Sequence, residues 1–152
     1  NSSQGAGVML AETRHMVKSV LDSFYSIGQS VLVQEFVGTE RGVDIRAFVV
    51  GGELIATIRR RAEDGEFRAN VHRGGAAELV RPDREMKRTA LEAVQSVGLD
   101  ICGLDMVETK DGPVVLEANV SPGLEAIETT TGVDVASRVI QHAVERRIRS
   151  LR

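Results

Sequence analysis

The chain has 152 residues, of which 42% are hydrophobic and 27% are charged, so its composition is that of one globular domain with its own core. A single cysteine, Cys102, excludes a disulfide framework, and a net charge of −3 excludes a general attraction for nucleic acid or an anionic membrane. Because no apolar run approaches the roughly 20 residues of a membrane helix and no secretory signal is visible, we expect a cytoplasmic protein without membrane or direct nucleic-acid partners.

The first quarter of the chain predicts a loop, a short strand, a helix and a second strand. Residues 2–7 are rich in glycine and serine, and residues 8–10 have the character of a strand. Between residues 12 and 27 the apolar side chains recur at helical spacing, and Gly28 is suited to follow the helix. The β-branched content of residues 31–37 favours a strand.

The middle of the chain has the pattern of an antiparallel hairpin. Residues 43–50 and 53–61 are predicted strands, and the pair Gly51-Gly52 between them is suited to a tight turn. Residues 62–81 show no clean period, so we predict a segment that is mostly loop, with a short strand at 67–69.

The second half predicts a helix, a second hairpin and a last helix. The first helix opens at Pro82-Asp83 and ends before Gly98, the strands are 99–108 and 113–120, and the last helix is 134–149. The residues of the last helix expected to face inward are Val135, Val139, Ile140, Ala143, Val144 and Ile148. This order predicts one α+β unit with a mostly antiparallel sheet and helices packed on it.

Three oxygen-bearing side chains gather on the second hairpin. A three-residue turn at 110–112 places Asp105 opposite Glu117, and Asn119, two residues further on, lies on the same face. Facing carboxylates repel each other unless a cation lies between them, and oxygen ligands suit magnesium or manganese. The alternative is that these are exposed residues of an edge strand with no ligand.

A cluster of arginines accompanies the first hairpin and the loop that follows. Arg59 and Arg61 alternate along one strand and therefore share a face, where they could bind a carboxylate or phosphate with paired hydrogen bonds. We expect both to face the same cleft as Asn119 and Arg60 to point away. The alternative is a solvated edge strand whose charges prevent aggregation.

Six segments, in chain order, resemble the RimK family of ATP-grasp carboxylate–amine ligases: SSQGAGVMLAE, VLVQEF, GVDIRAFVVGGELIATIRRRA, GEFRANVHRGGAA, GLDICGLDMVE and VVLEANVSPGLEAIETTTGVDVA. The resemblance implies an ATP-grasp fold, in which the nucleotide lies between two lobes, with ATP and two Mg²⁺ (or Mn²⁺) ions as cofactors. Residues 1–30 would belong to the small lobe and residues 31–152 to the large lobe. The N-terminal domain and a family lysine that precedes the glycine-rich loop would lie before Asn1.

The resemblance also implies site residues. The adenine hinge would consist of Glu35 and Phe36, and Asp44 would contact the nucleotide. The phosphate side would be lined by Arg68, Ala69 and Asn70, and the metal ions would be held by Asp105, Glu117 and Asn119.

The family chemistry implies a mechanism and substrates. The γ-phosphoryl group of ATP would pass to an acceptor carboxylate, and the amine of L-glutamate would attack the resulting acyl phosphate. We expect Arg59 or Arg61 to stabilise the developing charge and Arg73 to hold a substrate carboxylate. The acceptor would be the C-terminus of a ribosomal small-subunit protein, and self-association into a homo-oligomer is expected from the family.

Two alternative functions stay open on the sequence. One is an ATP-grasp ligase that acts on a small molecule or an amino-group carrier protein. The other is a non-catalytic nucleotide-binding module, which the position of the family lysine before Asn1 favours. For residues 1–152 alone we expect weak magnesium-dependent ATP binding and no ligation.

Overall fold

The computed structural model describes residues 7–63, 66–67, 69 and 75–151. The chain divides into two compact units, Asn1–Phe36 and Val37–Arg152. Each unit is described by itself below.

The first unit contains helix α1 (Arg14–Ser26), as the spacing of its apolar residues predicts. The hydroxyl of Thr13 accepts a hydrogen bond from the backbone N–H of Met16 at 3.2 Å, and Gly28 follows the helix with φ of +70°. The strands predicted at 8–10 and 31–37 are wrong, because neither segment forms a strand in the structure. β-Branched residues favour extended backbone, but a strand also needs a partner to pair with.

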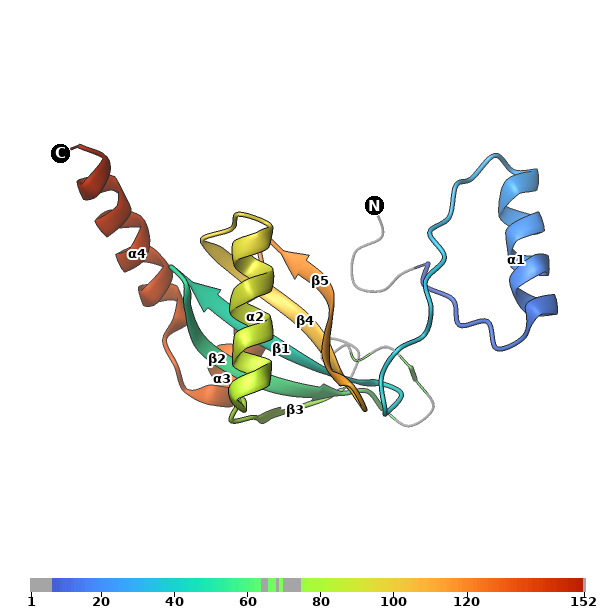
Figure 1. The fold of residues 1–152 in the computed structure, drawn as a ribbon, viewed down its shortest axis with the longest axis horizontal. Coiled ribbons are helices and arrows are strands. Elements are labelled where there is room, and N and C mark those ends of the chain that lie inside the picture. The colour runs from blue at the N-terminus through green and yellow to red at the C-terminus, as the bar shows by residue number, and fades with distance from the viewer. Residues whose placement is uncertain (1–6, 64–65, 68, 70–74, 152) are drawn as a thin grey trace. The chain divides into compact units, whose positions relative to one another are not determined.

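The second unit is built on an antiparallel sheet of five strands, in the spatial order β3-β2-β1-β4-β5 (Figure 1). The strands are β1 (Val43–Val50), β2 (Glu53–Arg61), β3 (Ala76–Leu79), β4 (Ile101–Thr109) and β5 (Gly112–Asn119). Both predicted hairpins form. Gly51 and Gly52, which connect β1 to β2, have φ of +59° and +81°, the left-handed region that glycine adopts without strain.

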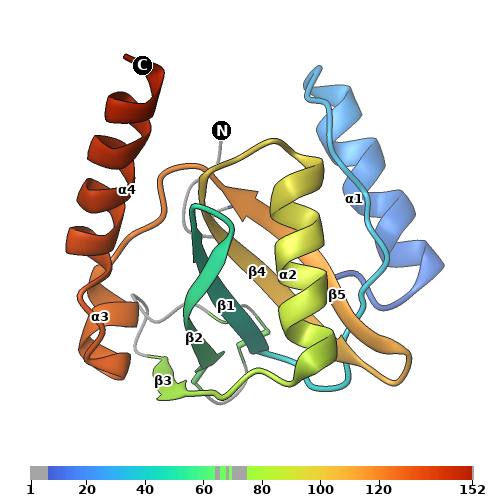
Figure 2. The same cartoon turned by 60° about the vertical axis from the view of Figure 1, so that its left-hand side comes forward.

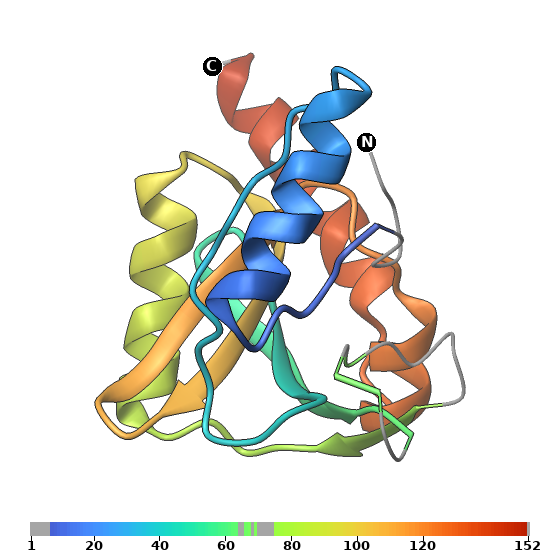
Figure 3. The ribbon, with the colours of Figure 1, turned by 90° about the vertical axis from the view of Figure 1, so that its right-hand side faces the viewer.

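Helices cover both faces of this sheet (Figures 2 and 3). Helix α2 (Arg84–Ser96) lies on one face, whereas α3 (Glu125–Thr131) and α4 (Val135–Ser150) lie on the other. The side chain of Asp83 caps α2 by accepting a hydrogen bond from the backbone N–H of Met86 at 2.7 Å.

Two hydrophobic cores result, and β1 contributes to both. Ile45, Ala47 and Val49 pack against α2, whereas Phe48 and Val50 pack on the side of α3 and α4. A strand in the middle of a sheet that is covered on both faces is apolar on both sides, which explains the nearly continuous hydrophobic run of β1.

Three details differ from the sequence prediction. The strand expected at 67–69 does not form at Phe67 or Ala69, while β3 and α3 were not predicted. The apolar residues of α4 also separate: Val135 is buried, but Ile140, Val144 and Ile148 are 64%, 53% and 50% exposed. Only the first part of α4 lies against the sheet, and the helix then continues past it (Figure 1). No helix among the described residues is long and apolar enough to span a membrane.

Candidate functional site

The second hairpin places Asp105 opposite Glu117, as predicted, but through a different turn. Thr109 pairs with Gly112 rather than with the next residue, so the turn has two residues instead of three. The register then shifts between Met106 and Asp105, where Leu116 is an extra residue in β5. This β-bulge restores the pairing that the longer turn would have given, because it advances β5 by one residue.

The three predicted metal ligands share one face of the sheet but differ in exposure. Asp105 is 9% exposed, Glu117 is exposed, and Asn119 is half-buried opposite Gly103. The side-chain nitrogen of Asn119 is buried without a hydrogen-bond partner among the described residues. A Cβ on Gly103 would lie 2.6 Å from Cβ of Pro122, so the segment after β5 packs closely over the sheet here.

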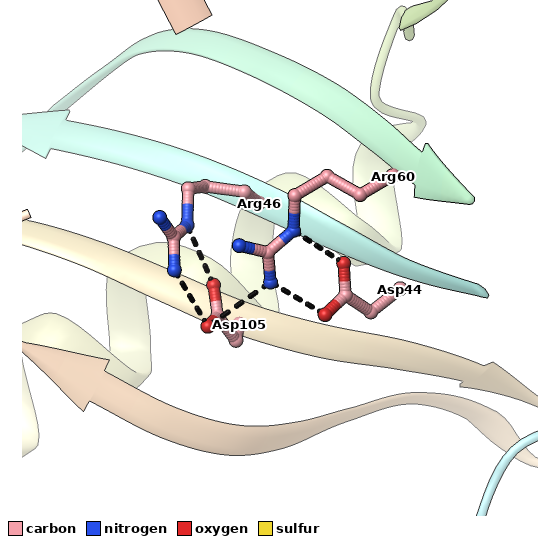
Figure 4. A network of polar contacts seen from close by, with 4 residues as sticks. All are labelled: Asp44, Arg46, Arg60 and Asp105. Carbon is pink, nitrogen blue, oxygen red and sulfur yellow. Dashed lines mark hydrogen bonds and ion pairs between the residues drawn. The ribbon is translucent and has the colours of Figure 1, made fainter. Parts of the chain in front are cut away.

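Two arginines and two aspartates form a network beside these ligands (Figure 4). Arg46 donates from Nε to Oδ1 and from Nη2 to Oδ2 of Asp105, both at 2.8 Å. Arg60 donates from Nε and Nη2 to the two oxygens of Asp44 at 2.7 and 2.5 Å, and its Nη2 lies 3.1 Å from Oδ2 of Asp105. The four side chains are between 10% and 18% exposed.

The ionisation of this network follows from burial and pairing. Burial raises the pKa of Asp44 above its ordinary value, although the hydrogen bond and charge of Arg60 act against the increase. Burial alone would lower the pKa of Arg60, but Asp44 and Asp105 outweigh it, so that this pKa is raised. Arg60 is therefore a permanent cation on the face that carries Asp105.

The expected placement of the arginines of β2 is wrong. In the strand register, Arg60 lies opposite Asp44, on the face that carries Asp105. Arg59 lies opposite Ile45, a residue of the core beneath α2, and Arg61 shares the face of Arg59.

The cause of this reversal is a second β-bulge. Val49 pairs with Leu54 but Phe48 pairs with Ala56, so Ile55 is an extra residue in β2. An uninterrupted hairpin from the two-residue turn would place Arg59 opposite Asp44, and the extra residue exchanges the faces of the arginines that follow.

On the other face, Arg59 and Arg61 have acidic partners. Arg59 donates to Oε1 of Glu78 at 3.2 Å and to Oε2 of Glu108 at 2.9 Å, and Arg61 pairs with Glu40. The hydrogen bond to Glu108 is the main reason that the pKa of Arg59 is raised. Both therefore lie in surface ion pairs rather than beside Asn119.

Of the remaining predicted residues, Glu35 and Phe36 are exposed at the end of the first unit, and Ala69 is half-buried outside any strand. Arg68, Asn70 and Arg73 lie outside the described residues, so their placement stays a prediction. Arg46 is the site residue that the sequence analysis missed. Its separation of two from Asp44 in one strand was the available signal, because such residues share a face.

The donor set fits a hard divalent cation. Two carboxylates and an amide lie on one face, and carboxylate and amide oxygens are ligands that Mg²⁺ accepts. Within the described part of the chain no three His, Cys, Asp or Glu side chains form a metal cluster, and Asn119 is the amide on the same face as the two carboxylates. Its buried Nδ2 is a hydrogen-bond donor without a partner among the described residues, whereas a metal ion would bind its amide oxygen.

The sequence matches the family model of the RimK-like ATP-grasp domain over residues 1–143. The chain is similar to the "Probable alpha-L-glutamate ligase" of Thioalkalivibrio sulfidiphilus (strain HL-EbGR7), with 51% identity over 137 residues, 90% of this chain and 46% of that protein. The chain thus spans about half the length of the curated relatives that it matches.

Solved structures show the same fold. The structure resembles the RimK domain protein ATP-grasp from Sphaerobacter thermophilus DSM 20745, with a TM-score of 0.65 and 24% identity over 93% of this chain and 49% of that chain. It also resembles the ATP-grasp ligase PsnB complexed with a phosphomimetic variant of its minimal precursor, Mg and ADP. There the TM-score is 0.58, with 19% identity over 86% of this chain and 50% of that chain.

Proposed function

Because the chain belongs to the RimK-like ATP-grasp family, we propose that it carries the metal site and nucleotide-contacting residues of an ATP-dependent ligase that adds L-glutamate to a carboxylate. In this reaction the γ-phosphoryl group of ATP passes to the acceptor carboxylate, and the amine of glutamate displaces phosphate from the acyl phosphate. The relatives named alpha-L-glutamate ligase support this reaction, and their greater length means that it is proposed for the full-length protein.

We assign the metal ligands to Asp105, Glu117 and Asn119, with Mg²⁺ or Mn²⁺ as the ion and two ions as the complement. The shared face of these side chains supports the choice of ligands, and the solved PsnB complex of the same fold with Mg and ADP supports Mg²⁺ as the ion. When bound, the ions neutralise negative charge on the transferring phosphates. The protein contributes fixed positions, since a hairpin with a defined register holds all three side chains.

The nucleotide contacts are proposed from the family resemblance. Glu35 and Phe36 read the adenine, and Arg68, Ala69 and Asn70 line the phosphates. Asp44 belongs to the same set, and its two hydrogen bonds with Arg60 connect the proposed nucleotide side of the site to Asp105.

The charge-stabilising role first expected of Arg59 or Arg61 passes to Arg60. Arg60 is the arginine of β2 that shares a face with the proposed metal ligands, and its raised pKa keeps it cationic. A fixed cation at this place can stabilise the negative charge that develops on the acyl phosphate and in the tetrahedral intermediate. Arg73 keeps its proposed role of holding a substrate carboxylate.

For the acceptor we propose the C-terminus of a ribosomal small-subunit protein. The solved complex of the ATP-grasp ligase PsnB with precursor peptide PsnA2 and AMPPNP supports a peptide as the acceptor class. A small molecule or a carrier protein is the competing acceptor. The homo-oligomer expected from the family stays a proposal.

The observation that carries the proposal is the pairing of Asp105 with Glu117 on a face that also presents Asn119. The test is ADP release by the full-length protein with ATP, Mg²⁺, L-glutamate and a panel of acceptors that includes a peptide ending in glutamate. We expect Asp105→Asn and Glu117→Gln each to reduce turnover by about 100-fold or more, since each removes a charged metal ligand.

The matched control is Asp111→Asn, which removes an exposed carboxylate from the turn of the same hairpin. We expect it to keep wild-type turnover. Glutamate-dependent ADP release that survives both ligand substitutions would refute the assignment of the metal site.

A further inference from the structure

Asp105, the most buried of the proposed metal ligands, has its hydrogen-bonding capacity largely filled by arginine. A carboxylate offers about four lone-pair positions on its two oxygens. Arg46 takes one position on each oxygen, at 2.8 Å in both cases, and Arg60 approaches Oδ2 at 3.1 Å. A metal ion that coordinates Asp105 therefore has to share or replace these contacts.

The local charge points to replacement. Two guanidinium groups balance two carboxylates in a network whose side chains are at most 18% exposed. A divalent cation bound between Asp105 and the exposed Glu117 would still lie beside two arginine charges in a partly desolvated place, where repulsion is weakly screened. The ion is much better accommodated if one arginine leaves Asp105.

The two arginines differ in how firmly they are held. Arg60 is anchored by two hydrogen bonds to Asp44 and would keep that partner if it lost Asp105. The side-chain hydrogen bonds of Arg46 with the described residues all go to Asp105. Arg46 is therefore the arginine whose position depends on Asp105.

We propose that Arg46 is an exchangeable counter-ion that holds Asp105 in the metal-free protein, competes with the metal ion for it, and thereby couples metal binding to nucleotide binding. Loss of Asp105 leaves the guanidinium of Arg46 without a hydrogen-bonded anion among the described residues, and the phosphates of a nucleotide supply one. Metal binding alone therefore leaves Arg46 without its hydrogen-bonded partner. When metal and nucleotide bind together, the phosphates give Arg46 a new partner. The inference rests on the proposed function, because it takes Asp105 as a metal ligand.

The test measures Mn²⁺ affinity in the full-length protein from the electron paramagnetic resonance signal of free Mn²⁺, with and without ADP. Without nucleotide, we expect Arg46→Ala to bind Mn²⁺ about tenfold more tightly than wild type. Arg46→Lys should give a smaller increase, because lysine keeps the charge but cannot make the paired hydrogen bonds. ADP should increase Mn²⁺ affinity less in Arg46→Ala than in wild type.

The matched control is Arg59→Ala, which removes a positive charge from the same sheet on the opposite face. We expect it to leave Mn²⁺ affinity within about twofold of wild type, since its charge is exposed and already paired. An Arg46→Lys variant with wild-type affinity would show that net charge alone matters and would overturn the exchange. Weaker Mn²⁺ binding in both Arg46 variants would show that Arg46 supports the site rather than competing for it.

Asp105→Asn separates failure of this inference from failure of the proposed function. If Asp105→Asn binds Mn²⁺ as wild type does, the metal does not use Asp105 and the proposed site is wrong. If Asp105→Asn loses Mn²⁺ while neither Arg46 variant gains affinity, the site stands and the counter-ion exchange fails. Cooperative thermal unfolding of each variant verifies that it is folded. If Arg46→Ala does not fold, the test can use Arg46→Lys, because lysine retains a cation beside Asp105.

Discussion

Arg59 and Arg60 are neighbours in sequence with opposite surroundings. The side chain of Arg60 is 10% exposed and bonded to two buried aspartates, whereas that of Arg59 is 29% exposed and pairs with two exposed glutamates. Adjacent residues of a strand point to opposite faces, so one face receives a buried cation and the other a surface ion pair.

We predict that Arg60→Ala destabilises the protein by about 3 kcal/mol, because it leaves Asp44 and part of Asp105 buried without a counter-ion. Arg59→Ala should cost less than about 1 kcal/mol, as is usual for exposed ion pairs. Chemical denaturation of the two variants measures both values. Equal losses would contradict the difference in environment.

At the scale of single residues, both the positive φ and a close side chain of α4 disfavour any residue other than glycine at Gly51. A Cβ there would lie 2.5 Å from Nδ1 of His142 in α4, whereas nothing lies within 4 Å of a Cβ on Gly52. Both glycines have positive φ, so alanine strains the backbone at either position.

We predict that Gly52→Ala costs about 1 kcal/mol from strain alone and that Gly51→Ala costs more, about 2–3 kcal/mol, because His142 has to move as well. The measurement is the free energy of unfolding of each variant, alone and combined with His142→Ala. If His142→Ala does not reduce the cost of Gly51→Ala, the contact is not the cause.

At the scale of elements, the two β-bulges explain which parts of the site could be predicted from sequence. Helix α2 and both hairpins follow from apolar spacing, an aspartate cap and glycine turns. The bulges fall at Ile55 and Leu116, within the apolar runs Leu54-Ile55-Ala56 and Val114-Val115-Leu116, where no polar residue reveals which side chain is extra. The bulge at Leu116 compensated for the incorrectly predicted length of the turn, so Asp105 lies opposite Glu117 as expected. The other placed Arg60, rather than Arg59, beside Asp105.

The N-terminus of α4 gives a prediction for pH. Oδ1 of Asp134 accepts a hydrogen bond from the backbone N–H of Ser137 at 2.8 Å, and this bond is the main cause of the lowered pKa of Asp134. A pKa that is lower in the folded state means that the folded protein binds fewer protons than the unfolded chain. This stabilisation is therefore present above the unfolded pKa of about 3.9 and is lost as the pH falls through the folded value.

Asp134→Asn keeps a capping oxygen but removes the charge. We expect the stability advantage of the wild-type protein over Asp134→Asn to be constant above about pH 5 and to shrink between about pH 5 and pH 3. Urea denaturation across this range measures the difference. A difference that does not depend on pH would contradict the assigned role of the carboxylate.

At the scale of the whole molecule, both cores lie within Val37–Arg152, whereas α1 in the first unit has no buried residue. The sequence predicted the α+β class and the antiparallel sheet, because these depend on local periodicity and turns. It could not predict β3, whose pairing with β2 joins Ile58 to Leu79 and Arg61 to Ala76, or the absence of a strand at 31–37. The pairing of β3 depends on contacts between residues distant in sequence, and residues 31–37 form no strand because a strand also needs a partner.

We predict that residues 37–152, produced alone, unfold in one cooperative transition with the far-ultraviolet circular dichroism of an α+β protein, because both cores are complete within them. Denaturant titration followed by two spectroscopic probes measures this. Non-coincident transitions or a gradual loss of signal would show that the first 36 residues are needed to form the cores.

The bulge at Leu116 has a consequence for how this hairpin can change during evolution. An extra residue can lie either in the turn or in β5 while Asp105 remains opposite Glu117, so the proposed ligand pair does not depend on one turn length. Deletion of Leu116 would remove the bulge and leave a regular ladder with the same pairing, and one residue added at Lys110-Asp111 would lengthen the turn to three residues while the bulge keeps the same pairing. Homologous hairpins of different length can therefore preserve the same pair of carboxylates.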